Sequence, residues 1–93
     1  MSYRVILDDL ALEDLDDLPA GTRRRMLRRL EALADDPRPG AAHALTRELR
    51  GLWRLRVGDY RASYTIDEET QTVHVWNAGH RSRFYDRASR KRR

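Results

Sequence analysis

Arginine is the residue type whose number and spacing in this sequence could do chemistry. All but one of the 19 lysines and arginines are arginine, and Arg54, Arg56 and Arg61 stand in a stretch where polar and apolar residues alternate. A guanidinium group keeps its proton near neutral pH and offers a planar set of donors that matches a phosphate. The pattern therefore favours a phosphate-bearing partner, above all a nucleic acid, although an acidic protein would also fit a basic surface.

Three histidines are the other side chains that could exchange a proton near neutral pH. His80 follows Gly79 at the end of an expected strand and could act as an acid, while His43 lies among alanines in an expected loop. A hydrogen-bonded structural role is the more common outcome for a lone histidine, and His74, in mid-strand, is assigned to packing or to the surface. The sequence has no cysteine, metal-ligand cluster, phosphate-binding glycine loop or nucleophile elbow, so we expect neither a metal nor a cofactor.

The charge is unevenly distributed along a chain of single-domain length. Residues 1–18 hold six of the 15 acidic residues and one arginine, so the net charge of +4 arises from the remainder. Ninety-three residues suffice for one domain with a modest core. We expect this domain at residues 1–87 and a basic, disordered tail at 88–93. No apolar run is long enough for a signal peptide or a membrane span, which predicts a soluble cytoplasmic protein.

The first 21 residues predict a strand and an acidic helix that must help to position the site. Residues 3–7 are β-rich, and Asp8 and Asp9 can cap the helix that follows. From about residue 9 to 18, apolar residues recur at helical spacing and leave the acids on the outer face, before Pro-Ala-Gly at 19–21 ends the helix. The apolar residues of this helix are Ala11, Leu12, Leu15 and Leu18.

A second, basic helix is expected from Thr22, which can cap it, to about Ala34. It would form an antiparallel hairpin with the acidic helix, and its five arginines would lie outside an apolar stripe. Pro37, Pro39 and Gly40 end this helix and open a loop of about ten residues that contains His43. The stripe consists of Met26, Leu27, Leu30, Leu33 and Ala34.

A β-hairpin carries the candidate arginines. Apolar and polar residues alternate over residues 53–57 and 60–66, on either side of a tight turn at Gly58–Asp59. Side chains two residues apart on a strand share a face, so Trp53 is expected in the core and the arginines on the opposite face. These arginines are Arg54, Arg56 and Arg61.

One more strand, at residues 72–78, completes the predicted order β-α-α-β-β-β. Its inward phase is open between Val73 with Val75 and Trp76 with Ala78, and Trp76 stays open between core and base-stacking surface. The order predicts an α+β fold with the helical hairpin on one face of a small, mostly antiparallel sheet and the arginines on the other. A solvated face that discourages aggregation is the alternative. We favour a bound polyanion, because three crowded like charges repel one another.

The hairpin and the segment that closes the domain resemble the RelE/ParE superfamily of toxins. The resemblance covers residues 2–87 and rests on the order of elements, on GLWRLRVGDYRASY at residues 51–64 and on AGHRSRFY at residues 78–85. It implies a RelE-like fold and the toxin of a type II toxin–antitoxin system. In the superfamily's ribosome-dependent RNase branch, the cationic site residues fall on Arg54, Arg56, Arg61 and Arg81, and the closing aromatic residue falls on Tyr85.

The resemblance implies an endoribonuclease that cleaves mRNA in the ribosomal A site through the RNA's own 2′-hydroxyl group, without a metal. Arg61 and Arg81 would stabilise the charged phosphorane, and Tyr85 would orient the RNA or donate a proton, although Tyr85 could equally pin the C-terminal segment to the core. The phosphate-binding residues would be Arg54, Arg56, Arg83 and His80.

The general base is the point at which this chain departs from the best-known members, which have lysines where it has Arg54 and Arg56. An arginine, with a pKa above about 12, cannot readily serve as a base, so these two are assigned to phosphate binding. A related branch has a glutamate base before the hairpin, and the alignment puts His43 at that position.

Two alternatives remain open: a ParE-like inhibitor of DNA gyrase with no nuclease activity, and a family member whose activity has lapsed. Under either toxin hypothesis the resemblance implies a cognate antitoxin that covers the positive face in a hetero-oligomer. Under the nuclease hypothesis mRNA and the ribosome are further partners. The acidic first helix, with Asp14 and Asp16, is expected to face away from the RNA and to meet the antitoxin or the basic helix.

Overall fold

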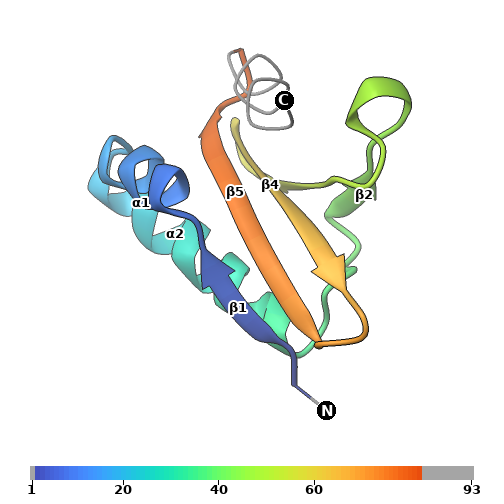
Figure 1. Ribbon diagram of the computed structural model, residues 1–93. Helices are drawn as coiled ribbons and strands as arrows, with labels where there is room; N and C mark the ends of the chain where they lie inside the picture. The colour runs from blue at the N-terminus through green and yellow to red at the C-terminus, as the bar shows by residue number, and fades with distance from the viewer. Residues whose placement is uncertain (1, 83–93) are drawn as a thin grey trace.

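The computed structural model describes residues 2–82, and the tail expected at residues 88–93 lies outside them. Within this range two α-helices lie on one face of a five-stranded sheet (Figure 1). Short 3-10 turns follow α2 at Ala32–Ala34 and β2 at Arg47–Leu49. The elements are β1 (Arg4–Leu7), α1 (Asp9–Asp16), α2 (Ala20–Glu31), β2 (Ala42–Ala44), β3 (Trp53–Val57), β4 (Tyr60–Asp67) and β5 (Thr72–His80).

The sheet is mixed and mostly antiparallel. Its strand order is β1-β5-β4-β3-β2, and β1 pairs with β5 in parallel while the other neighbours are antiparallel. This confirms the predicted α+β fold. The prediction lacked β2, which pairs with β3 inside the expected loop. Three residues show too little alternation to be recognised as a strand from sequence.

The core lies between the helices and one face of the sheet. Leu12, which the sequence pattern grouped with the other apolar residues of α1, does not join the core and is 46% exposed. Trp53 packs partly buried against the core, as predicted, with the Arg38 guanidinium carbon 5.5 Å from the ring centre. The main core residues are Ala11, Leu15, Met26, Leu30, Leu33, Leu55, Ala62, Tyr64, Val73, Val75 and Ala78.

The helix starts were predicted correctly for α1 and too late for α2. Asp8 caps α1, and its carboxylate accepts a hydrogen bond from the Leu10 amide at 3.1 Å. α2 begins directly after Pro19, which is the N-cap residue and makes no side-chain capping bond, so Thr22 lies buried in the first turn and does not cap the helix. None of the helices in residues 2–82 is long and apolar enough to cross a membrane.

A β-bulge in β5 resolves the inward phase that the sequence left open. Ser63 faces Asn77 and the next residue, Tyr64, faces Val75, so Trp76 is an extra residue on β5. An extra residue shifts the alternation by one position. Val73 and Val75 before it and Ala78 after it are therefore all buried in the core.

The acids of α1 do not all lie on its outer face, as the sequence suggested, because Asp14 is 2% exposed. β1 pairs with β5 only as far as Val75, so the edge of β5 beyond this point has no neighbouring strand on that side. α1 covers this edge, and the Asp14 carboxylate accepts a hydrogen bond from the Ala78 amide at 3.0 Å. A buried backbone amide needs such a partner.

The β3–β4 hairpin closes through the predicted tight turn. Gly58 has a φ of +61°, and Asp59 is not among the residues of positive φ. A two-residue loop with positive φ at its first position is the type II′ arrangement, which matches the natural twist of the strands. The turn fixes the register on which the candidate site depends.

Candidate nucleic-acid interface

Four of the predicted site residues lie on the sheet face that the helices leave uncovered. His43 on β2 faces Arg54 on β3, and Arg56 on β3 faces Arg61 on β4. Neighbouring strands lie about 4.8 Å apart, and directly opposed side chains share a face. The predicted grouping of the three arginines is confirmed, and His43 joins them through β2. These four residues are called the arginine face below.

Arg56 and Arg61 form a directly opposed pair of like charges, but the surroundings of the two side chains differ. Arg56 is exposed. The Nη1 atom of Arg61 donates to the carbonyl oxygens of Gly58 and Tyr60, at 2.8 and 3.0 Å. Arg61 therefore braces the hairpin turn in addition to contributing charge to the face.

A buried polar pair lies in the next row of the sheet, which sequence reasoning missed. Ser63 faces Arg54 on one side and Asn77 on the other, and both Ser63 and Asn77 are fully buried. The Ser63 hydroxyl donates to Asn77 Oδ1, while Asn77 Nδ2 has no hydrogen-bond partner within residues 2–82. Alternation put Ser63 on the outer face, but no signal in the sequence indicated its burial.

The remaining predicted residues are placed differently. His80 faces Tyr60, with the two rings edge to face at 5.3 Å, and lines a hollow of about 280 Å³ with Asp14 on the helix side of the sheet. The structure therefore does not bring His80 to the arginine face. Arg81 lies beside the hairpin turn, where its amide donates to the Asp59 carbonyl at 2.8 Å and its Nε is 4.0 Å from Asp59 Oδ1. Arg83 and Tyr85 lie outside the described residues.

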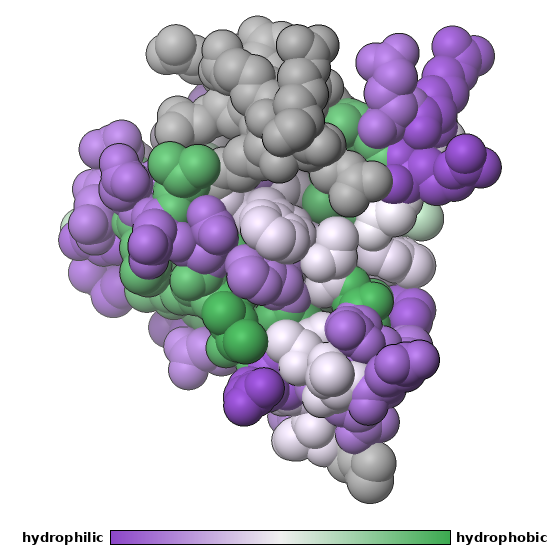
Figure 2. All heavy atoms as spheres, viewed as in Figure 1, coloured by the Kyte–Doolittle hydropathy of each residue, from purple (hydrophilic) through white to green (hydrophobic). Residues whose placement is uncertain are grey.

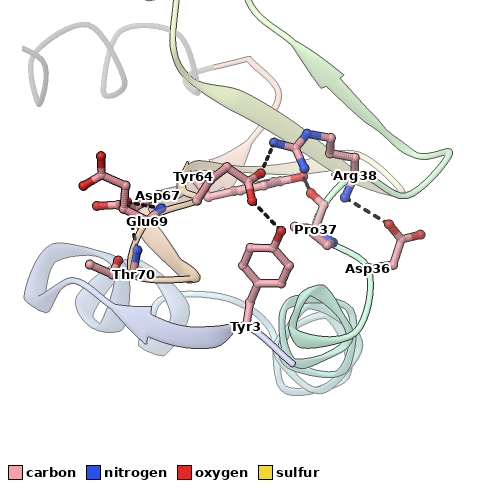
Figure 3. Close-up of polar contacts among 9 residues, drawn as sticks. Tyr3, Asp36, Pro37, Arg38, Tyr64, Asp67, Glu69 and Thr70 are labelled. Carbon is pink, nitrogen blue, oxygen red and sulfur yellow. Dashed lines mark hydrogen bonds and ion pairs between the residues drawn. The ribbon is translucent and has the colours of Figure 1, made fainter. Parts of the chain in front are cut away.

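A separate polar cluster fastens the opposite end of β4 (Figure 3). Glu68 accepts hydrogen bonds from the Tyr3 hydroxyl at 2.6 Å and from Arg38 at 2.5 Å. These bonds lower the pKa of Glu68 and raise that of Tyr3. The Tyr64 hydroxyl donates to the Pro37 carbonyl at 2.7 Å, and burial raises the pKa of Tyr64. This cluster ties the N-terminal segment to the loop before β2, away from the arginine face.

The coloured surface in the space-filling view (Figure 2) is mixed in hydropathy. Figure 2 shows a pale band of intermediate hydropathy over β4 and β5, and apolar surface over β1 and α1. The exposed apolar residues there are Ile6, Leu10 and Leu12. The arginine face combines guanidinium donors for phosphate with His43, a side chain that could exchange a proton.

The sequence matches one known family model over most of its length. Residues 5–85 match the model described as the ParE toxin of the type II toxin–antitoxin system parDE. The chain belongs to the RelE/ParE toxin superfamily. The resemblance seen in the sequence is thereby confirmed, and the chain is a toxin of type II toxin–antitoxin systems within this superfamily.

Solved structures of RelE/ParE toxins are similar to this one. The toxin–antitoxin complex RelBE2 from Mycobacterium tuberculosis aligns with 31% identity over 86% of this chain and 99% of that chain, with a TM-score of 0.78. The archaeal RelE–RelB complex from Pyrococcus horikoshii aligns with 28% identity over 89% and 99% of the two chains, with a TM-score of 0.76. Free RelE toxin from Escherichia coli, as a double mutant, shares the fold at 24% identity, with 98% of each chain covered and a TM-score of 0.77. No curated protein sequence matches the chain significantly.

Proposed function

We propose that this toxin is an endoribonuclease that cleaves mRNA in the ribosomal A site. The observation that carries the proposal is the register of β2, β3 and β4, which sets His43, Arg54, Arg56 and Arg61 side by side on the sheet face opposite the helices. Positive charge crowded on one face is relieved by a polyanion, and phosphate contacts dominate the affinity for nucleic acids. The similar RelE structures support the nuclease branch.

The chemistry requires no nucleophile from the protein. The RNA's 2′-oxygen loses a proton and bonds to the adjacent phosphorus, the bond from phosphorus to the 5′-oxygen breaks, and the 5′-oxygen takes up a proton. The products are a 2′,3′-cyclic phosphate and a 5′-hydroxyl end. Fixed cations opposite the phosphorane stabilise the charge that builds up in the transition state.

The roles of the residues follow from their chemistry and place. Arg54 and Arg56 hold phosphates, because a guanidinium cannot act as a base near neutral pH. Arg61 and Arg81, which both contact the hairpin turn, stabilise the phosphorane. His43, opposite Arg54, takes the 2′-hydroxyl proton. Tyr85 is proposed to orient the RNA or to protonate the leaving oxygen.

The partners of the proposal are mRNA, the ribosome and a cognate antitoxin, which place the reaction in the cytoplasm. The similar solved toxins from M. tuberculosis and P. horikoshii are in complexes with antitoxins. We propose that this chain likewise forms a hetero-oligomer with an antitoxin that covers the arginine face.

Inhibition of DNA gyrase is the second candidate, because the matching family model is that of ParE. The two functions differ in what happens to RNA. A gyrase inhibitor blocks supercoiling and leaves transcripts intact, whereas the nuclease produces new 5′ ends inside translated reading frames.

The test is to induce the chain alone in bacterial cells and to map RNA 5′ ends across the transcriptome. We expect cuts inside reading frames with the wild type and at least a tenfold loss in an Arg56→Ala/Arg81→Ala variant. Arg24→Ala/Arg25→Ala removes the same charge from the exposed side of α2 and should leave the cuts unchanged. Growth arrest with intact RNA and blocked supercoiling would establish the gyrase alternative, and no effect in a folded protein would indicate lapsed activity.

A further inference from the structure

An aromatic pair on the sheet face opposite the helices has no part in the chemistry proposed above. His74 and Trp76 stand two residues apart on β5, and their rings stack with centroids 3.9 Å apart and planes 17° apart. Both side chains are partly buried, so part of the pair reaches solvent. The pair lies on the same face as the arginines, because His74 faces Thr65 and Thr65 shares its face of β4 with Arg61.

The core does not require this pair. Because of the bulge, Val73, Val75 and Ala78 all lie buried in the core. Trp76 is the extra residue of the bulge and pairs with no residue of β4. The two stacked rings therefore lie on the sheet face opposite the helices, where a partly exposed aromatic surface is available to a planar ligand.

Both rings are held in place by neighbouring strands and loops. The Trp76 indole Nε1 donates to the Thr65 hydroxyl at 3.0 Å. His74 Nε2 lies 3.6 Å from Asp8 Oδ1. A ring fixed in advance loses little conformational freedom when a planar ligand stacks on it. The pair is therefore built as a rigid surface.

The position of the pair relative to the arginines indicates what would stack there. Asn77, next to Trp76, faces Ser63, and Ser63 faces Arg54. Two strand spacings separate β3 from β5, which is about 10 Å. Neighbouring parts of one extended nucleic-acid strand can span this distance, with a phosphate on the arginines and a base on the rings. Unpaired bases stack on aromatic side chains in this way.

We propose that the stacked His74 and Trp76 side chains form a base-binding subsite for an unpaired RNA base whose flanking phosphates lie on the arginine face. The inference rests on the proposed function, since it requires RNA on this face. Stacking tolerates every base, so the subsite positions the strand and does not select a sequence. His74 and Trp76 are positioning residues.

The test uses the fluorescence of Trp76 in the full chain. Trp53→Phe leaves Trp76 as the one tryptophan, because the sequence has two. The probe is a short single-stranded RNA with 2′-O-methyl groups, which cannot be cleaved by 2′-hydroxyl attack, added at low salt. We expect Trp76 emission to be quenched as RNA binds, with binding followed independently by the anisotropy of labelled RNA. In the matched Trp76→Phe variant, which keeps Trp53, emission should stay constant.

The affinities supply the second readout. Trp76→Ala should weaken RNA binding about 5- to 150-fold, whereas Trp76→Phe, which keeps an aromatic face, should weaken it less than about fivefold. His74→Phe, which keeps an aromatic ring at this position, should retain RNA binding and show the circular dichroism of the wild type. It is the variant to use if Trp76→Ala is too unstable. RNA that binds without quenching, at unchanged affinity in the alanine variant, would overturn the subsite and leave the nuclease proposal standing. Absence of any RNA binding by the folded wild type would overturn both.

Discussion

Asp14 accepts a hydrogen bond from the backbone amide of Ala78 at 3.0 Å, although 64 residues separate them in the chain. Asp14→Ala leaves this buried amide without the acceptor, and we expect the free energy of unfolding to fall by about 1–3 kcal/mol. Asp14→Asn keeps a side-chain oxygen and should cost less. Urea unfolding measures both, with Asp16→Ala, an exposed acid of the same helix, as a control that should change stability by less than about 0.5 kcal/mol. Equal effects at the two positions would contradict the structural role of Asp14.

Arg61 and Arg56 face each other but should differ in what they contribute to stability. Arg61 donates to two carbonyls of the hairpin turn, so Arg61→Ala should lower the free energy of unfolding by about 0.5–1.5 kcal/mol. Arg56→Ala removes one of two opposed like charges and should be neutral or slightly stabilising. Thermal unfolding of the two variants tests the difference, and a larger loss for Arg56→Ala would show that the turn does not depend on Arg61. Arg56→Ala therefore removes charge from the arginine face without removing a bond to the turn.

Gly58 has room for a side chain, but its backbone conformation is one that residues with a side chain disfavour. A Cβ atom at this position would meet nothing within 4 Å, yet its φ is +61°. Gly58→Ala should therefore lower the free energy of unfolding by about 1–2 kcal/mol through backbone strain alone. Gly58→Asn should cost less, because asparagine accepts positive φ more readily. A neutral alanine variant in urea unfolding would argue against the strained turn.

Glu68 should make stability fall at acid pH. Hydrogen bonds from Tyr3 and Arg38 lower its pKa below the ordinary value of 4.5 in the folded protein. The stabilisation is thus complete above the ordinary pKa and is lost as the pH falls through the lowered one. Melting temperatures of Glu68→Gln should start lower at neutral pH and approach those of the wild type as the pH drops below 4.5.

Glu69→Gln is the matched control for this pH dependence, because the Glu69 side chain makes no hydrogen bond or ion pair within residues 2–82. Its melting temperature should follow the wild-type curve. Parallel curves for the wild type and Glu68→Gln across the acid range would refute the role of Glu68.

The elements that the sequence predicted well are those with long, regular patterns. The alternation in residues 53–57 and 60–66 gave the hairpin and the shared face of its three arginines, and the acidic cap at Asp8 gave the start of α1. Each depends on neighbours in the chain or on a two-residue turn. Local patterns of this kind need no knowledge of the tertiary fold.

What the sequence could not show depends on contacts between distant segments. The bulge at Trp76 arises from how β5 meets β4, and the burial of Asp14 arises because β1 is shorter than β5. β2 exists because β3 offers a free edge, so His43 reached the arginine face through a strand too short to predict. The same bulge moves the alternation of β5 by one residue and turns His80 toward Tyr60, away from the arginine face.

The parallel pairing of β1 with β5 has a consequence for the order of folding. Residue 4 pairs with residue 72, and β5 also lies between β1 and β4 in the sheet. Both halves of the sheet therefore depend on β5, and a nascent chain makes β5 last among the strands of residues 2–82. Contacts between distant segments also form slowly, because a long loop must first close. The helices and the first hairpin can form early, but the continuous sheet behind the arginine face cannot be assembled until translation has passed β5. A product truncated before that point would carry most of the arginines without the surface that organises them.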